Sequence, residues 1–233
     1  MKALIFAAGL GERMRPLTNH TPKPLLVAGG KPLIVWHLEK LAALGVRDVV
    51  INTSWLAEQF PATLGDGAQW GLRLHYSYEG PTPLETGGGM WHALPLLGSD
   101  PFLLVNGDIW IDYDFARLPL EPTGLAHLVM VDRPGHATHG DFALDDDGRV
   151  RADGATRLTY AGLGIYRPQL LDGWQDITAD ADTTGDKPRF RLAPILKAYM
   201  PTGQISGEHH RGRWTDVGTP ERLAWLDAEL NQR

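Results

Sequence analysis

The chain has 233 residues, of which 43% are hydrophobic and 21% are charged, and these values fit one globular core with a small additional lobe. The formal net charge of −6 argues against a basic surface for nucleic acid. The absence of cysteine excludes disulfides and thiolate metal sites, and no apolar run approaches the length of a membrane span. We therefore expect a cytoplasmic protein with no nucleic-acid or membrane partner, and nothing in the sequence indicates an oligomeric state.

The first apolar run, residues 4–8, predicts a buried strand that leads into a glycine-containing loop. Gly9 and Gly11 would let backbone N–H groups approach a phosphate closely. Three cations that could neutralise a polyphosphate follow: Arg13, Arg15 and Lys23. The loop lacks the Gly-Lys-Ser/Thr ending of a Walker loop, and Met14 stands at the third glycine position of the dinucleotide fingerprint. An ordinary strand-to-helix turn would explain the glycines alone, but the cations favour a phosphate site.

Strands and helices alternate along the rest of the chain. Apolar spacing predicts helices at residues 32–44, 56–64, 90–97, 192–199 and from 220 onward. Short apolar or alternating runs predict strands at residues 48–52, 72–76, 102–108, 126–131, 140–144 and 158–166. The polar, acidic stretch 178–187 predicts a mobile surface loop. This alternation predicts an α/β fold with a parallel sheet, in which ligands collect at the carboxyl ends of the strands.

Two aspartates from distant segments are candidates for a metal site. Asp108 ends a buried run, and Asp216 precedes the last predicted helix. A turn or helix cap would explain Asp108 on its own, and capping by Thr219 and Pro220 explains the residues after Asp216 but not Asp216 itself. Two carboxylates completed by phosphate oxygens and water suit octahedral Mg²⁺. We therefore predict that Asp108 and Asp216 bind magnesium.

Residues 7–25, AAGLGERMRPLTNHTPKPL, resemble the signature loop AAGxGxRxxPLTxxxPKPL of the sugar-1-phosphate nucleotidyltransferases, and the resemblance covers nearly the whole chain. It implies a Rossmann-like three-layer sandwich with a mostly parallel central sheet. It also implies an enzyme that joins a nucleoside triphosphate to a sugar 1-phosphate and releases pyrophosphate. We expect a single domain, in which residues 1–110 mainly bind the nucleotide and residues 111–233 mainly bind the sugar phosphate.

The resemblance assigns roles to individual positions. Arg13 and Lys23 would be catalytic, acting on the β- and γ-phosphates and on the α-phosphate respectively. Further nucleotide-binding residues would be Ala7, Ala8, Gly9, Gly11, Arg15, Glu79, Glu85, Thr86 and Gly87. Residues that bind the sugar phosphate would be Asn106, Gly140, Gly162 and Arg191. Asp108 and Asp216 match the metal-binding positions of the family.

The second glycine-rich stretch, 83–89, would face the nucleobase in this family, although Glu85 stands where relatives usually have glycine. Glu79 is the best match to the base-reading residue. A carboxylate accepts hydrogen bonds only, so it could accept from N3–H of uracil or thymine, or from N1–H and the amino group of guanine. On the acceptor side, Tyr160 replaces a usual asparagine and one acidic motif is missing, which disfavours an ordinary glucose or N-acetylglucosamine acceptor.

Longer phrases, including PLETGGG, FLLVNGD and SGEHHRGRWTDVGT, are most similar to the family members that transfer a uridylyl group from UTP to N-acetylmuramate α-1-phosphate in peptidoglycan recycling. The lactyl carboxylate of that acceptor would need a cation, for which Arg191, His209 and Arg211 are candidates. One alternative is a guanylyl- or thymidylyltransferase for a neutral hexose 1-phosphate. A second is a catalytically silent sensor of nucleotide sugars, which the retained phosphate cations and aspartates disfavour.

Overall fold

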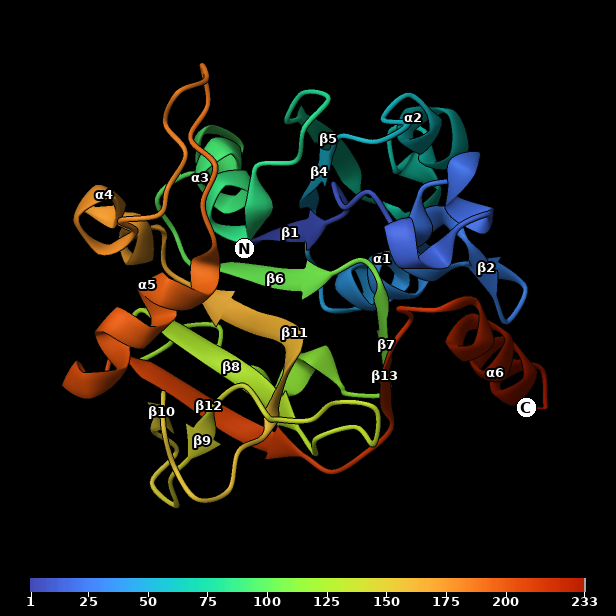
Figure 1. Cartoon of the computed structure of the whole chain (residues 1–233). Coiled ribbons are helices and arrows are strands. Elements are labelled where there is room, and N and C mark those ends of the chain that lie inside the picture. Colours follow the sequence, from blue (N-terminus) through green and yellow to red (C-terminus); the bar gives the residue numbers. More distant parts are fainter. Residues whose placement is uncertain (233) are drawn as a thin grey trace.

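A seven-stranded sheet runs through the centre of the computed structural model, which describes residues 1–232 (Figure 1). Its strand order is β12-β8-β11-β6-β1-β4-β5. The strands are β1 (Lys2–Phe6), β4 (Asp48–Thr53), β5 (Arg73–Tyr78), β6 (Phe102–Asn106), β8 (Ala126–Val131), β11 (Thr159–Tyr166) and β12 (Ile205–His210). Strand β11 runs antiparallel to β6 and β8, and the other neighbouring pairs are parallel. The sheet is therefore mostly parallel, and both halves of the chain contribute strands to it.

Helices cover both faces of this sheet, which gives the three-layer sandwich that the sequence predicts. Helices α1 (Leu33–Ala43) and α2 (Gln59–Leu64) share a core with Ala3 and Ile5 of β1. Helices α3 (Glu85–Leu97), α4 (Trp174–Ile177) and α5 (Leu192–Tyr199) share the opposite core with Leu4. Successive residues of a strand point to opposite faces, so a strand buried on both sides must be apolar throughout. This requirement explains the unbroken apolar runs of β1, β4 and β6.

Shorter elements surround the sandwich. Two-stranded ladders pair β2 (Val27–Ala28) with β3 (Lys31–Pro32), β9 (Ala143–Leu144) with β10 (Val150–Arg151), and β7 (Ile109–Ile111) with β13 (Trp214–Asp216). Helix α6 (Pro220–Asn231) packs against a third apolar cluster that includes Met14, Trp110 and Val217. Single 3₁₀ turns lie at Glu12–Met14, Leu17–Asn19, Lys23–Leu25, Ala68–Trp70, Phe115–Arg117, Pro168–Leu171 and Met200–Thr202. Within the described part of the chain, none of the helices has the length and apolar character needed to cross a membrane.

Most predicted elements appear close to their expected bounds. The helix expected at 192–199 is α5, and the last helix begins at Pro220 with the Thr219 hydroxyl accepting from the Arg222 amide. The strand expected at 140–144 is shorter, because only Ala143–Leu144 pairs as β9. The stretch 178–187 forms one arm and the tip of a hairpin, with Asp182 and Arg189 exchanging two backbone hydrogen bonds of 2.9 Å.

The three consecutive glycines were expected in a loop, and this expectation is wrong, because they lie in the first turns of α3. Here glycine allows close packing rather than a flexible turn. A Cβ atom at Gly87 would lie 2.5 Å from the Phe190 ring, and one at Gly88 would lie 2.5 Å from the Pro188 carbonyl oxygen. The missing side chains let the segment 188–191 pack directly against the start of α3.

We predict that Gly88→Ala destabilises the protein although alanine favours helices. The helix gain is about 1 kcal/mol, and forcing a methyl group against a backbone carbonyl costs about 1–3 kcal/mol. Urea denaturation should show a net loss of unfolding free energy, while Gly135→Ala, where nothing lies within 4 Å of the added methyl, should show none. Equal stability of the two variants would contradict the close approach at Gly88.

Candidate active site

A pocket of about 680 Å³ opens at the carboxyl ends of β1, β4 and β6. Residues just after β1, Asn52 of β4, and Asn106 with Asp108 at the end of β6 line it. Parallel strands bring these ends to one edge of the sheet, where ligands of open α/β sheets bind. The pocket therefore lies where the strand order predicts.

The glycine-containing loop forms one wall of the pocket. Residues 7–14 line it, and the Ala7 amide donates to the Asn52 side-chain oxygen over 2.6 Å. Gly11 has a left-handed backbone with φ of 65°, and its carbonyl accepts from the Thr18 hydroxyl over 2.8 Å. A Cβ atom at Gly11 would lie 2.8 Å from the Thr18 methyl group, so the turn requires glycine for both conformation and space. Arg13 is solvent-exposed at this wall, where its charge can meet an incoming anion.

Lys23 and Asp108 form an ion pair at the pocket. The Lys23 ammonium lies 2.5 Å from Asp108 Oδ2, and the lysine residue as a whole is only 9% exposed. Pro22 and Pro24 flank the lysine in a 3₁₀ turn, which limits the directions that the backbone can take. The turn thus holds the lysine charge against the end of β6.

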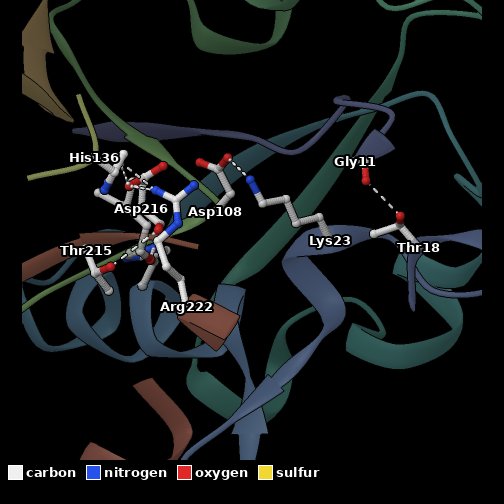
Figure 2. A network of polar contacts seen from close by, with 10 residues as sticks. Gly11, Thr18, Lys23, Asp108, His136, Thr215, Asp216 and Arg222 are labelled. Atoms are coloured by element: carbon white, nitrogen blue, oxygen red, sulfur yellow. Dashed lines mark hydrogen bonds and ion pairs between the residues drawn. The ribbon is translucent and has the colours of Figure 1, made fainter. Parts of the chain in front are cut away.

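Asp216 lies next to Asp108 because their backbones pair. Asp216 is opposite Ile109 in the β7–β13 ladder, and the Val217 amide donates to the Asp108 carbonyl over 2.8 Å. The Asp216 carboxylate contacts the Arg222 guanidinium at 2.5 Å and His136 Nε2 at 3.2 Å. Figure 2 shows Lys23 directed at Asp108 from one side, with Asp216 and Arg222 on the other. The structure therefore brings the two predicted metal-binding aspartates together, each with a cation beside it.

Behind this ladder, His37 of α1 supports the backbone that carries Asp108. His37 is buried, and its Nε2 lies 2.9 Å from the Ile109 carbonyl oxygen, while Nδ1 has no hydrogen-bond partner among the described residues. Burial, together with the nearby positive charge of Lys40, lowers the pKa of His37 from 6.5 to about 4. A neutral imidazole can donate from Nε2 to the carbonyl, and it adds no charge to the core.

Glu79, Glu85 and Thr86 also line the pocket. Glu79 is 3% exposed, and its carboxylate oxygens accept from Asn52 Nδ2 over 2.6 Å and from the Leu84 amide over 2.7 Å. Burial raises the pKa of the Glu79 carboxyl. Glu79 therefore closes the loop 79–84 besides lining the pocket.

Several predicted site residues lie outside the pocket lining: Arg15, Gly87, Gly140, Gly162, Arg191, His209, Arg211 and Asp216. Arg15 and Arg191 are exposed, and Gly140 packs against the Arg157 backbone. Gly162 lies behind a lining residue, because a Cβ atom there would meet the Asn106 amide at 2.6 Å. Asp216 is nevertheless at the site, because its backbone pairs with the segment that carries Asp108. The other seven predicted residues do not line the pocket.

Sequence reasoning missed four residues at the site: Asn52, Arg189, His136 and Arg222. Asn52 was placed in a strand, and Arg189 lies just beyond the stretch 178–187 that was interpreted as a loop. Arg222 falls in the first turn of α6, six residues after Asp216, where an ordinary helical surface charge would look the same. Only the contact between its guanidinium and the Asp216 carboxylate in the structure shows that this side chain turns back toward Asp216.

Comparison with known proteins identifies the family. The Nucleotidyl transferase family matches residues 2–233. The chain belongs to this family. It is 47% identical over 230 residues to an N-acetylmuramate α-1-phosphate uridylyltransferase of Neisseria meningitidis, covering 96% of this chain and 95% of the relative. It is 36% identical to a protein of the same name from Caulobacter vibrioides, covering 98% and 96% of the two chains.

A more distant relative and a solved structure are also similar to this chain. A mannose-1-phosphate guanylyltransferase of Mycobacterium tuberculosis is 31% identical, with 98% of this chain and 64% of the relative covered. The fold matches a Bacillus anthracis protein assigned as a glucose-1-phosphate thymidylyltransferase, with a TM-score of 0.85 at 20% identity over 100% of this chain and 96% of the other. The chain is thus a sugar-1-phosphate nucleotidyltransferase with the Rossmann-like fold that the sequence predicts.

We predict that stability depends on pH through His37. The unfolded state binds a proton near pH 6.5, but the folded state binds it only near pH 4, so stability falls as the pH falls between these values. The full effect is about 3 kcal/mol. Urea denaturation from pH 7 to pH 4 should show a shallower decline for His37→Gln, whose amide can still donate to Ile109. His139→Gln, at an exposed histidine, controls for the substitution itself, and parallel wild-type and His37→Gln profiles would contradict the assignment.

Proposed function

We propose that this nucleotidyltransferase transfers the uridylyl group of UTP to N-acetylmuramate α-1-phosphate, which forms UDP-N-acetylmuramate and pyrophosphate. The supporting observation for phosphoryl transfer is the convergence of Lys23, Asp108 and Asp216 beside the glycine-containing loop. The supporting observation for this substrate pair is the identity of 47% and 36%, over nearly the whole chain, with relatives of that name. We further propose that the enzyme acts in the cytoplasm in peptidoglycan recycling.

The proposed reaction needs no activated side-chain nucleophile. A phosphate oxygen of the acceptor forms a bond to the α-phosphorus of UTP, and the bond from that phosphorus to the bridging oxygen breaks, so pyrophosphate leaves with the electron pair. The protein's task is alignment and neutralisation of the developing charge. Lys23, which is nearly buried at the loop, would contact the α-phosphate and the leaving oxygen. The exposed Arg13 would bind the β- and γ-phosphates.

Asp108 and Asp216 would hold Mg²⁺ in this proposal. The described residues contain no group of three or more histidine, cysteine, aspartate or glutamate side chains arranged for a metal. Two carboxylates on paired backbone segments nevertheless fit a magnesium ion whose other ligands are phosphate oxygens and water. Bound magnesium would neutralise phosphate charge. Lys23 and Arg222, which pair with these carboxylates in the structure, would then be available to phosphate oxygens.

Of the residues predicted to bind the sugar phosphate, only Asn106 lines the pocket in the described part of the chain. The missing side chain of Gly162 leaves room for the Asn106 amide. Arg191, His209 and Arg211 remain the proposed cations for the lactyl carboxylate, although none of them lines the pocket. His209 Nε2 already lies 2.9 Å from Asp132 Oδ1, which makes the two arginines the more available charges.

The substrates are tested by measuring pyrophosphate release from UTP, CTP, GTP, ATP and dTTP with N-acetylmuramate 1-phosphate, N-acetylglucosamine 1-phosphate and mannose 1-phosphate. We expect the highest kcat/KM for UTP with N-acetylmuramate 1-phosphate. Preference for GTP with mannose 1-phosphate would instead support the guanylyltransferase alternative, for which the Mycobacterium tuberculosis relative is the precedent. Nucleotide binding without turnover of any pair would support the silent sensor.

We predict that Lys23→Ala and Asp108→Ala each lower kcat by about 10²–10³, because each removes a charge next to the transferred phosphate. Lys197→Ala, at an exposed lysine of α5, should keep normal turnover. Circular dichroism of the three variants should match the wild type. Near-normal turnover of either site variant would remove that residue from the mechanism.

A further inference from the structure

Glu85 has a backbone conformation that ordinarily belongs to glycine. Its φ is 63°, and Leu56 is the other non-glycine residue with positive φ in the described part of the chain. Residues other than glycine rarely adopt this left-handed conformation, because their Cβ atom crowds the backbone. Such positions persist where the surroundings hold them, and they cluster at ligand sites. The side chain of Glu85 should therefore have a role that glycine could not fill.

That side chain forms an ion pair with Arg189. Glu85 Oε1 accepts from Arg189 Nη2 over 2.8 Å, and Arg189 Nε donates to the Pro83 carbonyl over 3.1 Å. Both side chains are partly exposed, at 36% and 45%, and both residues line the pocket. One arginine thus joins the segment before α3 to the first residue of that helix.

Arg189 is held in place by the hairpin that ends with it, residues 182–189. The two strands of this 182–189 hairpin exchange backbone hydrogen bonds at Asp182 and Arg189. Lys187 donates to the Tyr78 and Glu79 carbonyls over 2.9 and 3.3 Å. The hairpin projects beside α3 in Figure 1, in orange. These contacts fasten a segment from late in the chain to the rim of the pocket near Glu79.

The pair lines the same pocket as the phosphate loop. The loop 7–14, Lys23 and Asp108 form the phosphate-binding part, whereas Glu79, Pro83, Glu85 and Arg189 line the remaining wall. A triphosphate bound at the loop would direct its nucleobase toward this wall. Glu79 is only 3% exposed, and each of its oxygens already accepts one hydrogen bond from the protein, so its carboxylate is less accessible to a nucleobase than that of Glu85.

The Glu85–Arg189 pair, in contrast, keeps one donor and one acceptor available. Arg189 Nη1 and Glu85 Oε2 have no hydrogen-bond partner among the described residues. A guanidinium donates only, and a carboxylate accepts only. Together they complement an edge that presents a carbonyl oxygen next to a ring N–H. Uracil has this edge at O4 and N3–H, and guanine has it at O6 and N1–H. Cytosine and adenine present an amino group next to an unprotonated ring nitrogen, so each contact would be mismatched.

We propose that Glu85 and Arg189 form a specificity-determining pair that selects nucleobases with a carbonyl next to a ring N–H. The inference rests on the proposed nucleotidyl transfer from UTP and assigns base reading to this pair rather than to Glu79.

The test compares UTP with CTP, which have the same ring size and differ at the two atoms in question. Isothermal titration calorimetry on the intact protein gives Kd for each nucleotide. We expect the wild type to favour UTP, and Arg189→Ala and Glu85→Gly to weaken UTP binding by about 10- to 100-fold with little change for CTP. Glu85→Gln reverses the polarity at one atom, so it should shift preference toward CTP. Arg151→Ala, at a second exposed ion pair, is the matched control and should bind UTP normally.

Thermal unfolding separates base reading from folding. Glu85→Gly relieves an unfavourable backbone conformation, so it should unfold at a temperature no lower than that of the wild type even though its UTP affinity falls. Leu56→Gly, at the other such position, should keep the UTP:CTP ratio of the wild type.

An unchanged UTP:CTP ratio in Arg189→Ala and Glu85→Gly would overturn the inference, as would a wild type that prefers CTP or ATP. A wild type that binds GTP over ATP and rejects UTP would overturn the uridylyl proposal. Loss of that GTP preference in the same two variants would still support the pair.

Discussion

The active site depends on one short backbone ladder, the pairing of β7 with β13. Residues 108 and 216 are far apart in the chain, and the fold brings their carboxylates together by pairing the backbones that carry them. The ladder does this with Asp216 opposite Ile109 and with the Val217 amide bonded to the Asp108 carbonyl. His37 contacts the Ile109 carbonyl from the core side, and α6 packs on Val217 and Trp110. The site is thus positioned from the sheet core and from the last helix at once.

Two carboxylates on neighbouring strands repel each other, so the ladder would be weak without nearby positive charge. The chain carries a net charge of −6, and yet the cations concentrate here. Lys23 comes from the loop after β1 and Arg222 from α6, and His136 Nε2, from the segment after β8, also contacts Asp216. Each pair stabilises the folded site. The same cations suit a polyphosphate ligand, so the groups that stabilise the folded site are also suited to its chemistry.

The sequence predicted the parts of this site that depend on local residue order. The strand ending in the loop 7–14, the helix starting at Pro220 and the strand ending near Asp108 follow from spacing and turn residues alone, and their bounds agree with the structure within a few residues. The glycines at 87–89 were misplaced because their reason is tertiary: they make room for the segment 188–191. Arg222 and Arg189 were missed for the same reason, because a charge on a helix or in a polar hairpin has no local mark that distinguishes pairing across the fold from solvent exposure.

This difference between local and tertiary signals also separates chemistry from specificity. The residues that would handle phosphate lie on strand ends and a glycine turn, where the backbone itself sets their positions. In contrast, the positions of Glu79 and Glu85 depend on side-chain pairs between distant segments, Glu85 with Arg189 and Glu79 with Asn52. Tyr160, on the predicted acceptor side, is also held by a side-chain pair. Its hydroxyl accepts a hydrogen bond from the Tyr166 hydroxyl over 2.7 Å, and both rings pack in the core that includes α5. Tyr160 thus takes part in packing rather than lining the pocket. Substrate preference can therefore change through such pairs while the β7–β13 ladder and the phosphate loop stay as they are.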